Sequence, residues 1–298
     1  MNTAGQKHVL VMVNPKSGLW WSFDMMRRAI DEAWDNPETD LCYQFCQNAE
    51  DGVNKAVRAV ARGVETVLVV GGDGTISTIG RALLDTGVCL GAVPAGSGNG
   101  FARHFGIPLS PDKAVRALAT ARVQRIDVGM IDETPFFVTC SMAWDAAIVK
   151  SFAKSPVRGI VPYVLAGVHE LFEYEPQDIW VALDGRPERR LPSPMVFTIA
   201  NLSQYGGGAR IAPRARADDG CLELVVALRQ DVPKLIARVH RLFDGSADTI
   251  PELISERFKS MTIRRERAAP IQIDGELVDA GRDLRVRVVP AALNVLVP

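Results

Sequence analysis

The stretch Thr66-Val-Leu-Val-Val-Gly-Gly-Asp-Gly-Thr75 joins a short apolar run to a glycine-rich turn that carries one acid and one hydroxyl. Residues 67–70 are all aliphatic, which is typical of a strand that is covered on both faces of a parallel sheet. The three glycines allow the backbone to turn tightly and to approach a ligand closely, and the final threonine falls where the next helix would begin. The stretch therefore predicts that Asp73 lies at the carboxyl edge of a sheet.

The same stretch also has a plainer interpretation, which is a tight turn capped by Asp73 and Thr75. Two further loops weigh against it, because each of them also follows a predicted strand. Asn14-Pro15-Lys16-Ser17-Gly18 follows the first strand, and Pro94-Ala95-Gly96-Ser97-Gly98-Asn99-Gly100 follows the fourth. The carboxyl ends of parallel strands meet at one edge of the sheet, where open α/β folds bind their ligands. The three loops together predict a ligand site at that edge.

The chemistry of these three loops suits phosphate groups. Backbone N–H groups in glycine-rich turns, together with hydroxyl and amide side chains, can hold a polyphosphate without a charged clamp. Each loop taken singly is weaker evidence for a ligand site, because Asn-Pro opens ordinary turns and the third loop could be a helix start capped by Ser97 or Asn99. The residues expected to hold the phosphate groups of a ligand are Asn14, Pro15, Ser17, Gly71, Gly72, Gly74, Thr75, Gly96, Ser97, Gly98 and Asn99.

Two common nucleotide-binding motifs are absent from the sequence. The Gly-x4-Gly-Lys-Ser/Thr pattern of P-loop NTPases does not occur. No Gly-x-Gly-x-x-Gly fingerprint opens the helix after the first strand, and Gly96-x-Gly98-x-Gly100 has a different spacing. A nucleotide would therefore be held by neither of these two arrangements.

The composition is that of an ordinary globular protein. The 298 residues are 47% hydrophobic and 23% charged, with a net charge of -1, which gives no support to nucleic-acid binding. The five scattered cysteines favour reduced thiols in the cytoplasm over a disulfide framework. There is no signal-peptide pattern, and no apolar run reaches the length of about 18 residues that a membrane span needs. We therefore expect a soluble protein, or one that associates peripherally with a membrane.

Strand and helix patterns alternate through the first part of the chain and then give way to short strands. The alternating part covers residues 1–124 and predicts an α/β domain with a parallel sheet. In residues 125–298 most segments are β-branched or alternating and are separated by Gly, Pro or Asp turns, which predicts a β-rich domain. Helical patterns interrupt this domain as two insertions, at residues 159–174 and 232–243. Among its predicted strands are residues 136–142, 258–264, 284–289 and 293–297.

Several motifs occur in the order found in a known family. In the first part they are Asn14-Pro15-x-Ser17-Gly18, Gly71-Gly72-Asp73-Gly74-Thr75 and Pro94-x-Gly96-Ser97-Gly98-Asn99-x-Phe101-Ala102-Arg103. In the second part they are Arg125-Ile126-Asp127-Val128-Gly129, Trp144-Asp145-Ala146-Ala147, Asn201-x3-Tyr205-Gly206-Gly207-Gly208, Ala217-Asp218-Asp219-Gly220-x-Leu222-Glu223 and Asp274-Gly275-Glu276. On these motifs, nearly the whole chain resembles the diacylglycerol kinase catalytic-domain family, which includes bacterial lipid kinases and sphingosine kinases and is related in fold to NAD kinases.

The resemblance implies a Rossmann-like nucleotide-binding α/β domain that holds ATP, followed by a β-sandwich domain that binds the lipid substrate. The C-terminal strand of the second domain could return to the first. The implied activity is that of an ATP- and Mg²⁺-dependent kinase that transfers the γ-phosphate to a lipid hydroxyl. Two alternatives stay open: a kinase of a soluble alcohol, like the NAD kinases, and a catalytically silent regulator that binds a nucleotide or a lipid.

The resemblance also implies roles for individual acids. Asp73 matches the family acid near the transferred phosphate, either as a Mg²⁺ ligand or as the general base. Asp127 and Glu276 match an acidic pair beside the acceptor hydroxyl, where Glu276 could remove the proton while Asp127 orients the hydroxyl. Which of these three carboxylates is the base stays open.

Two further sites follow from the same resemblance. Asp218, Asp219 and Leu222 match an accessory Mg²⁺ site, and paired carboxylates on a tight turn suit an ion that prefers oxygen ligands. Asp145 matches a position near the lipid head group, and its place before Ala146 is equally typical of a helix N-cap.

Some of these acids also have a purely structural interpretation. Asp274-Gly275 lies between two β-type runs, which is a strong signal for a type I′ hairpin, and Asp219-Gly220 is a second such signal. Each pair could serve only to turn a strand. The family context favours a functional role for Glu276 and weakens the hairpin interpretation of Asp219.

The sequence leaves the acceptor lipid open between diacylglycerol-like and sphingosine-like molecules. Gly100 stands where bacterial diacylglycerol kinases usually carry aspartate, and Ser141-Met142-Ala143-Trp144 is closer to sphingosine kinases. An apolar helical pattern within residues 152–172 would suit a lipid tail or a plain core equally. The expected setting is the cytoplasm, with peripheral association at the inner face of the membrane and no nucleic-acid partner. A homodimer is compatible with the sequence.

Overall fold

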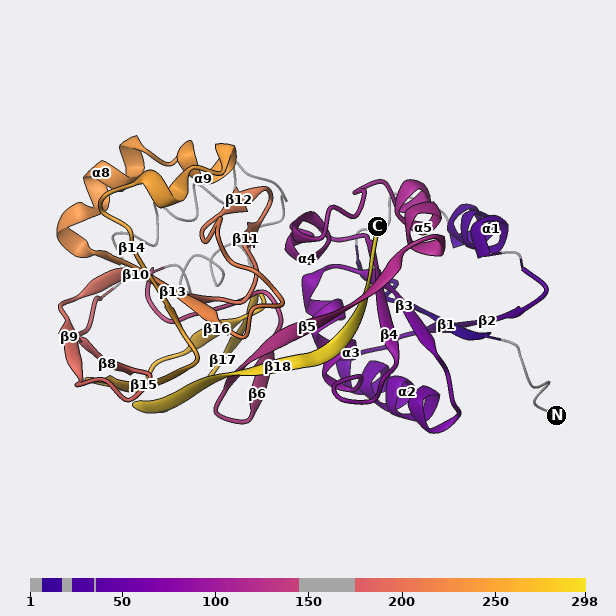
Figure 1. Ribbon diagram of the computed structural model, residues 1–298, viewed down its shortest axis with the longest axis horizontal. Helices are drawn as coiled ribbons and strands as arrows, with labels where there is room; N and C mark the ends of the chain where they lie inside the picture. Colours follow the sequence, from indigo (N-terminus) through magenta and orange to yellow (C-terminus); the bar gives the residue numbers. More distant parts are fainter. Residues whose placement is uncertain (1–6, 18–22, 35, 145–174) are drawn as a thin grey trace. The chain divides into compact units, whose positions relative to one another are not determined.

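Figure 1 shows the computed structural model, which describes residues 7–17, 23–34, 36–144 and 175–298. The chain divides into two compact units: residues 1–126 with 291–298 form the first, and residues 127–290 form the second. Strands β5 (Arg122–Ile131) and β18 (Asp283–Val297) each begin in one unit and end in the other.

A parallel sheet of apolar strands forms the centre of the first unit. Its strands lie in the order β2 (Thr39–Phe45), β1 (Lys7–Val13), β3 (Thr66–Gly71) and β4 (Cys89–Pro94). All neighbouring strands run parallel, and Asn294 and Val295 of β18 extend the sheet beyond β4. Residues 67–70 are completely shielded from solvent, which confirms a strand covered on both faces.

The order of these strands reverses at β1. The chain passes from β1 to β2 on one side and then crosses back, so that β3 lies on the other side of β1. The register aligns Val13 with Val70 and Gly71 with Pro94. The loops after β1, β3 and β4 therefore leave the sheet side by side at its carboxyl edge, with a topological switch point between β1 and β3.

Five described helices belong to the first unit. Helices α1 (Phe23–Trp34) and α5 (Pro111–Ala119) pack together on one side of the sheet (Figure 1). Helices α2 (Ala49–Ala61) and α3 (Asp73–Arg81) pack together on the other side. Helix α4 (Gly100–His104) is a short helix after β4. Within the described residues, no helix is both long enough and apolar enough to span a membrane.

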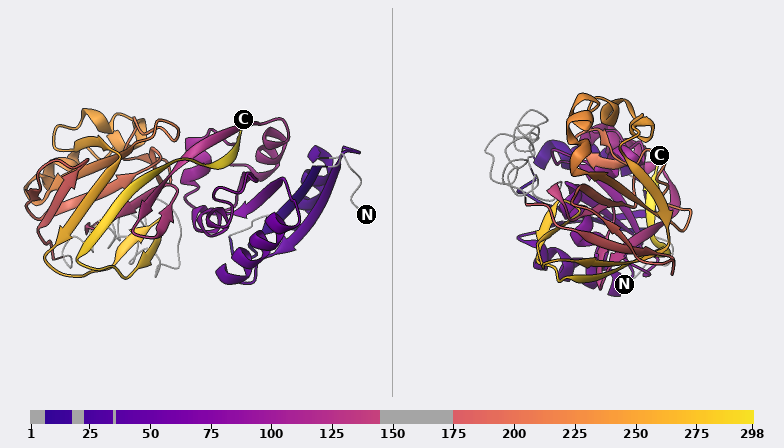
Figure 2. Two further views of the ribbon diagram at one scale, coloured as in Figure 1. Left: turned by 60° about the horizontal axis from the view of Figure 1, so that its bottom comes forward. Right: turned by 90° about the vertical axis from the view of Figure 1, so that its left-hand side faces the viewer.

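Two sheets form a β-sandwich in the second unit, as the family resemblance implies (Figure 2). The first sheet is antiparallel, in the order β14 (Ile254–Phe258), β13 (Leu222–Leu228), β10 (Pro194–Ala200), β7 (Thr139–Ser141), β16 (Ile271–Ile273) and β17 (Glu276–Val278). The second contains β18, β15 (Ser260–Arg265), β8 (Ile179–Leu183) and β9 (Arg189–Leu191), with β5 and β6 (Thr134–Phe136) beside them. A separate hairpin joins β11 (Gln204–Gly206) to β12 (Ala209–Arg210). Side chains of both sheets share one buried cluster, which includes Phe197, Phe258 and Ile263.

Three stretches of predicted strand differ in extent from the structure. Residues 136–142 are divided between β6 and β7, because the intervening N–H groups are bonded to the carboxylate of Asp274 instead of a neighbouring strand. Residues 258–264 are divided between β14 and β15 at Lys259, whose N–H is bonded to Asp184. The two strands predicted within residues 284–297 are one continuous strand, β18.

The helical pattern predicted at residues 232–243 is present in the structure. Helices α8 (Val232–Ala237) and α9 (Arg241–Asp244) lie there, and Leu242 packs against a small apolar cluster that includes Val225 of β13. The other predicted insertion, at residues 159–174, lies outside the described residues.

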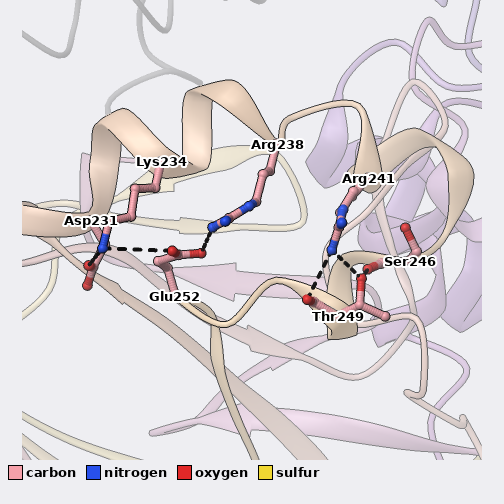
Figure 3. A network of polar contacts seen from close by, with 7 residues as sticks. All are labelled: Asp231, Lys234, Arg238, Arg241, Ser246, Thr249 and Glu252. Carbon is pink, nitrogen blue, oxygen red and sulfur yellow. Dashed lines mark hydrogen bonds and ion pairs between the residues drawn. The ribbon is translucent and has the colours of Figure 1, made fainter.

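A network of polar contacts fastens these helices to the loop that follows them (Figure 3). Glu252 accepts a hydrogen bond from Arg238 and lies 3.9 Å from the ammonium group of Lys234. Arg241 donates to both the carbonyl oxygen and the hydroxyl of Thr249, at 3.1 and 2.8 Å. The hydrogen bond from Arg238 is the main cause that lowers the pKa of Glu252 below its ordinary value.

We expect the Glu252→Gln variant to melt at a lower temperature than the wild type near neutral pH, because glutamine keeps the shape of the side chain and removes its charge. The folded pKa of Glu252 lies below the unfolded value of about 4.3, so this stabilisation is present above the unfolded pKa and is lost as the pH falls through the folded pKa. The difference in melting temperature, measured by circular dichroism, should shrink on acidification.

The matched control is Glu133→Gln, in the exposed turn between β5 and β6, which should leave the melting temperature unchanged at every pH. If the Glu252→Gln difference were as large in acid as at neutral pH, the charge of Glu252 would not be its source.

Candidate functional site

Asn14 ties the first loop to the second at the switch point. Its amide group donates a hydrogen bond to the hydroxyl of Thr75 at 2.8 Å, and its side-chain oxygen accepts one from the N–H of Lys16 at 3.0 Å. Pro15 and Lys16 are exposed, whereas Ser17 is partly buried. Asn14 therefore fixes the start of α3 to the end of β1 and shapes the first loop.

Asp73 joins the second loop to the third. Its two carboxylate oxygens accept hydrogen bonds from the N–H groups of Gly100 and Phe101, each at 2.9 Å. These are N–H groups of the first turn of α4, which have no partner within their own helix. Burial raises the pKa of the Asp73 carboxyl, against the opposing effects of these N–H donors and of Arg103. Asp73 thus acts as a cap for a helix that begins 27 residues later in the chain.

Three glycines of the second and third loops, Gly71, Gly72 and Gly96, have no space for a side chain. A Cβ atom added at Gly96 would lie 2.6 Å from the Cα atom of Gly72, and one added at Gly72 would lie 3.1 Å from the Cα atom of Gly96. At Gly71 an added Cβ would lie 2.6 Å from the Cβ atom of Thr75. Because the two loops touch through their backbones, no side chain can be accommodated at their closest approach.

Asn99 holds the third loop in shape. It lies in the left-handed region, with a φ of 51°, and both ends of its amide are bonded to the backbone of Gly96, at 3.0 and 2.7 Å. The third loop does start a helix, and Asn99 occupies the N-cap position of α4, but its side chain makes no cap hydrogen bond. Ser97 is exposed, and the carboxylate of Asp73 accepts the N–H groups that a capping side chain would accept. Gly98 contributes its carbonyl oxygen, which accepts a hydrogen bond from Arg103.

Asp127 is the most deeply buried of the predicted catalytic acids and lies in the second unit. Its side chain accepts a hydrogen bond from the N–H of Gly220 at 2.6 Å, and its own N–H donates to the carbonyl oxygen of Ala217 at 2.6 Å. Only 3% of the residue is exposed. These two bonds bring Asp127 against the turn that carries Asp218 and Asp219.

Arginines engage both carboxylates of this turn. Asp219 is paired with Arg257, and Asp218 lies 3.4 Å from Arg216. Leu222, the third residue predicted for the accessory Mg²⁺ site, is the fully buried first residue of β13. In the part of the chain that the structure describes, no group of three or more His, Cys, Asp or Glu side chains is arranged to hold a metal ion. The accessory site stays a prediction.

The two hairpin signals have different outcomes. Asp274 and Gly275 have positive φ values, 47° and 91°, and link β16 to β17 with Ile273 opposite Glu276, so they form the predicted type I′ hairpin. The hairpin interpretation of Asp219-Gly220 is wrong, because the strand that follows it, β13, pairs with β10 and β14. Glu276 is exposed at the start of β17.

Two residues of the second unit have a structural importance that the sequence analysis did not assign. Asp274 is buried, and its carboxylate accepts hydrogen bonds from the N–H groups of Phe137, Val138 and Thr139, at 2.8, 2.7 and 3.2 Å. Asn201 is buried at the end of β10 and donates to the carbonyl oxygens of Asp127 and Phe137, both at 2.9 Å. In the sequence, Asn201 could have been noticed as a polar residue that directly follows an apolar predicted strand.

Two predicted substrate features cannot be placed. Asp145, the expected head-group contact, lies outside the described residues, and so does the apolar pattern within residues 152–172. Among the described residues, the three predicted loops therefore lie in the first unit, and the predicted acids Asp127 and Glu276 lie in the second.

Two family models together match most of the chain. Residues 8–131 match the diacylglycerol kinase catalytic domain, and residues 139–297 match the YegS C-terminal NAD kinase beta sandwich-like domain. The chain belongs to the diacylglycerol kinase catalytic-domain family. Because this is a family of lipid kinases, the chain is a phosphotransferase.

Individual members of the family are similar to this chain over most of their own length. A diacylglycerol kinase of Mycobacterium tuberculosis is 30% identical, over 84% of this chain and 82% of its own. A protein of Chromohalobacter salexigens named "Probable lipid kinase YegS-like" is also 30% identical, over 83% and 81%. The crystal structure of a diacylglycerol kinase from Bacillus anthracis is 18% identical and has a TM-score of 0.74, over 98% of this chain and 97% of that one, which shows a shared fold.

Proposed function

We propose that this family member uses ATP, together with Mg²⁺, to phosphorylate the hydroxyl group of a diacylglycerol-like or sphingosine-like lipid while it is associated peripherally with the cytoplasmic face of a membrane. The observation that carries the proposal is the junction of the three loops in the first unit. Asp73 bonds the third loop to the second, and Asn14 bonds the first to the second. A rigid edge of glycine-rich backbone at a switch point is a favourable place for nucleotide phosphates.

Phosphoryl transfer needs little covalent chemistry from the protein, so positioning and electrostatics dominate. In this proposal the fixed loops hold the phosphates of ATP, and their geometry is preset because Gly72 and Gly96 are in backbone contact. Mg²⁺ bound with ATP would neutralise the phosphate charge. No catalytic step is assigned to a metal at Asp218 and Asp219, because arginines engage both carboxylates.

The acids of the second unit would act on the acceptor lipid. Glu276 is exposed and can approach a hydroxyl group, whereas Asp127 is buried and bonded to the backbone of Gly220. This difference supports Glu276 as the group that removes the hydroxyl proton and Asp127 as the group that orients the acceptor.

The test is phosphate transfer from γ-labelled ATP into mixed micelles that contain diacylglycerol, sphingosine, monoacylglycerol or no lipid. We expect a labelled lipid with at least one acceptor. We expect Glu276→Gln to lower turnover by about 10²- to 10⁴-fold, the usual contribution of general-base catalysis, while ATP binding persists. Glu133→Gln, an exposed glutamate on another turn of the same unit, is the matched control and should be as active as the wild type.

Two results would contradict the proposal. If ATP bound without any lipid product and a soluble alcohol such as NAD became labelled, the acceptor class would be wrong. If Glu276→Gln kept wild-type turnover on a lipid, the role proposed for Glu276 would be wrong.

A further inference from the structure

The second unit uses aspartates with positive φ to fasten its turns to neighbouring strands. Asp132, Asp184 and Asp274 have φ values of 49°, 50° and 47°. Each aspartate exchanges two hydrogen bonds with one residue of a nearby strand. Its N–H donates to the carbonyl oxygen of that residue, and its carboxylate accepts the N–H of the same residue. The partners are Arg285 for Asp132, Ser260 for Asp184 and Thr139 for Asp274. Aspartate tolerates this conformation better than most residues. The arrangement carries a strand pairing on into the turn that follows it, because β5 pairs with β18, β8 with β15 and β16 with β7.

Asp274 is the most heavily bonded of the three. Its carboxylate accepts three N–H groups, whereas that of Asp184 accepts two, from Lys259 and Ser260, and that of Asp132 accepts one, from Arg285. It is also buried, with 6% of the residue exposed, whereas Asp184 is exposed. The anchor is strongest at the turn that leads into Glu276.

Within the described part of the chain, few regular pairings hold the hairpin that carries Glu276. Strand β17 has three residues and, among the strands that the structure describes, lies at the end of its sheet and pairs with β16 alone. Strand β16 also has three residues and is aligned with β7 at two positions, Gln272 with Ser141 and Ile273 with Cys140. A short edge hairpin of this kind is marginal in isolation. The bonds to Asp274 therefore fix where Glu276 lies.

The same bonds connect Glu276 to the other predicted acid. The N–H of Phe137 donates to Asp274, and the carbonyl oxygen of Phe137 accepts a hydrogen bond from Asn201. The amide group of Asn201 also donates to the carbonyl oxygen of Asp127. Asp127 and Glu276 are thus attached to one chain of hydrogen bonds that passes through two buried polar side chains.

We propose that Asp274 and Asn201 are positioning residues, which hold Glu276 and Asp127 in a fixed relation for phosphoryl transfer. The inference rests on the proposed function, because it assigns these two acids to the acceptor hydroxyl. Displacement of a reacting group by about 1 Å can lower turnover by about 100-fold. The buried hydrogen-bonded chain prevents such a displacement.

The test is the Asp274→Asn variant. Asparagine tolerates positive φ in a type I′ turn, so the hairpin is retained. Its amide offers one acceptor oxygen, and its NH₂ group faces N–H donors, so the anchor is weakened. We expect kcat to fall by about 10- to 100-fold with little change in KM for ATP, whose loops lie in the first unit.

A double-mutant cycle with Glu276→Gln separates positioning from general damage. If Asp274 acts through Glu276, adding Asp274→Asn to Glu276→Gln lowers kcat by a much smaller factor than it does in the wild type. A general structural defect would lower kcat by the same factor in both backgrounds. Asp184→Asn is the matched control, because it weakens the same kind of anchor at another Asp-Gly turn of the unit. It should lower the melting temperature and leave kcat unchanged.

Wild-type kcat in a folded Asp274→Asn protein would overturn the positioning role and leave the proposed function intact. Wild-type kcat on a lipid in Glu276→Gln would overturn the role proposed for Glu276 and with it this inference, whereas the absence of any labelled lipid with the wild-type protein would overturn the proposed function itself. If Asp274→Asn did not fold, Asn201→Ser would carry the same test in a cycle with Asp127→Asn. If Asn201→Ser lowered kcat by a much smaller factor in the Asp127→Asn background than in the wild type, the inference would be supported. If it lowered kcat by the same factor in both backgrounds, the inference would be overturned.

Discussion

The Asp73→Asn variant is expected to transfer phosphate at least about 100-fold more slowly than the wild type and to bind ATP more weakly. An asparagine side chain offers one oxygen to the two N–H groups that Asp73 now bonds, those of Gly100 and Phe101. The other N–H would face an NH₂ group. An unsatisfied buried N–H costs about 1–3 kcal/mol, so α4 and the third loop would move away from the second.

Two measurements check this expectation: single-turnover transfer from γ-labelled ATP, and ATP affinity by calorimetry. The matched control is Asp51→Asn. Asp51 also accepts a backbone N–H, from Gln47 beside the start of α2, but it lies outside the three loops. This control should keep wild-type transfer. If Asp73→Asn were as active as the wild type, the link between the loops would have no catalytic importance.

The Gly96→Ala variant is expected to weaken ATP binding by about 10- to 100-fold. The new Cβ atom would lie 2.6 Å from the Cα atom of Gly72, a separation that real Cβ atoms do not tolerate. Because the obstacle is backbone, one of the two loops must shift, and overpacking of this kind costs about 1–3 kcal/mol. Each 1.4 kcal/mol lost from ATP binding corresponds to a factor of about ten in Kd.

Calorimetry of ATP binding, with a melting curve on the same sample, measures this effect. Gly91→Ala is the control of similar crowding, since its Cβ would lie 2.5 Å from a terminal methyl group of Leu68. A side-chain end can rotate away, and Gly91 lies within β4 instead of a loop. This variant should lower the melting temperature and keep the ATP affinity. If Gly96→Ala bound ATP like the wild type, the contact between the loops would not shape the nucleotide site.

The parallel sheet and its three loops could be predicted because their signals are local. A run of aliphatic residues that ends in glycines specifies both a buried strand and the turn after it, as residues 66–75 show. The side-by-side arrangement of the loops then follows from the topology of parallel strands. The type I′ turn at Asp274-Gly275 is local in the same sense, since both residues tolerate positive φ.

The bonds that hold the site together could not be predicted, because their partners are distant in sequence. Asp73 bonds residues 27 and 28 positions away, Asn201 bonds a carbonyl oxygen 74 positions away, and Asp274 bonds N–H groups 135 to 137 positions away. Periodicity reports which face of a segment is buried and gives no information about which distant group a carboxylate meets. For this reason Asp274 could be recognised as a turn residue but not as the anchor of residues 137–139.

The return of β18 to the first unit sets the order in which this protein can complete its fold during synthesis. The side chain of Asn294, which pairs beside β4, is bonded to Gly87, 207 residues earlier in the chain. The ribosome therefore makes the whole second unit before β4 receives its outer neighbour. Until then, among the strands that the structure describes, β4 has no partner on that side. An edge with unpaired backbone groups is the kind of surface that recruits chaperones or other nascent chains. The three loops for which we propose nucleotide binding are complete in sequence by residue 100. The sheet that carries them is finished only by a strand that is translated nearly 200 residues later.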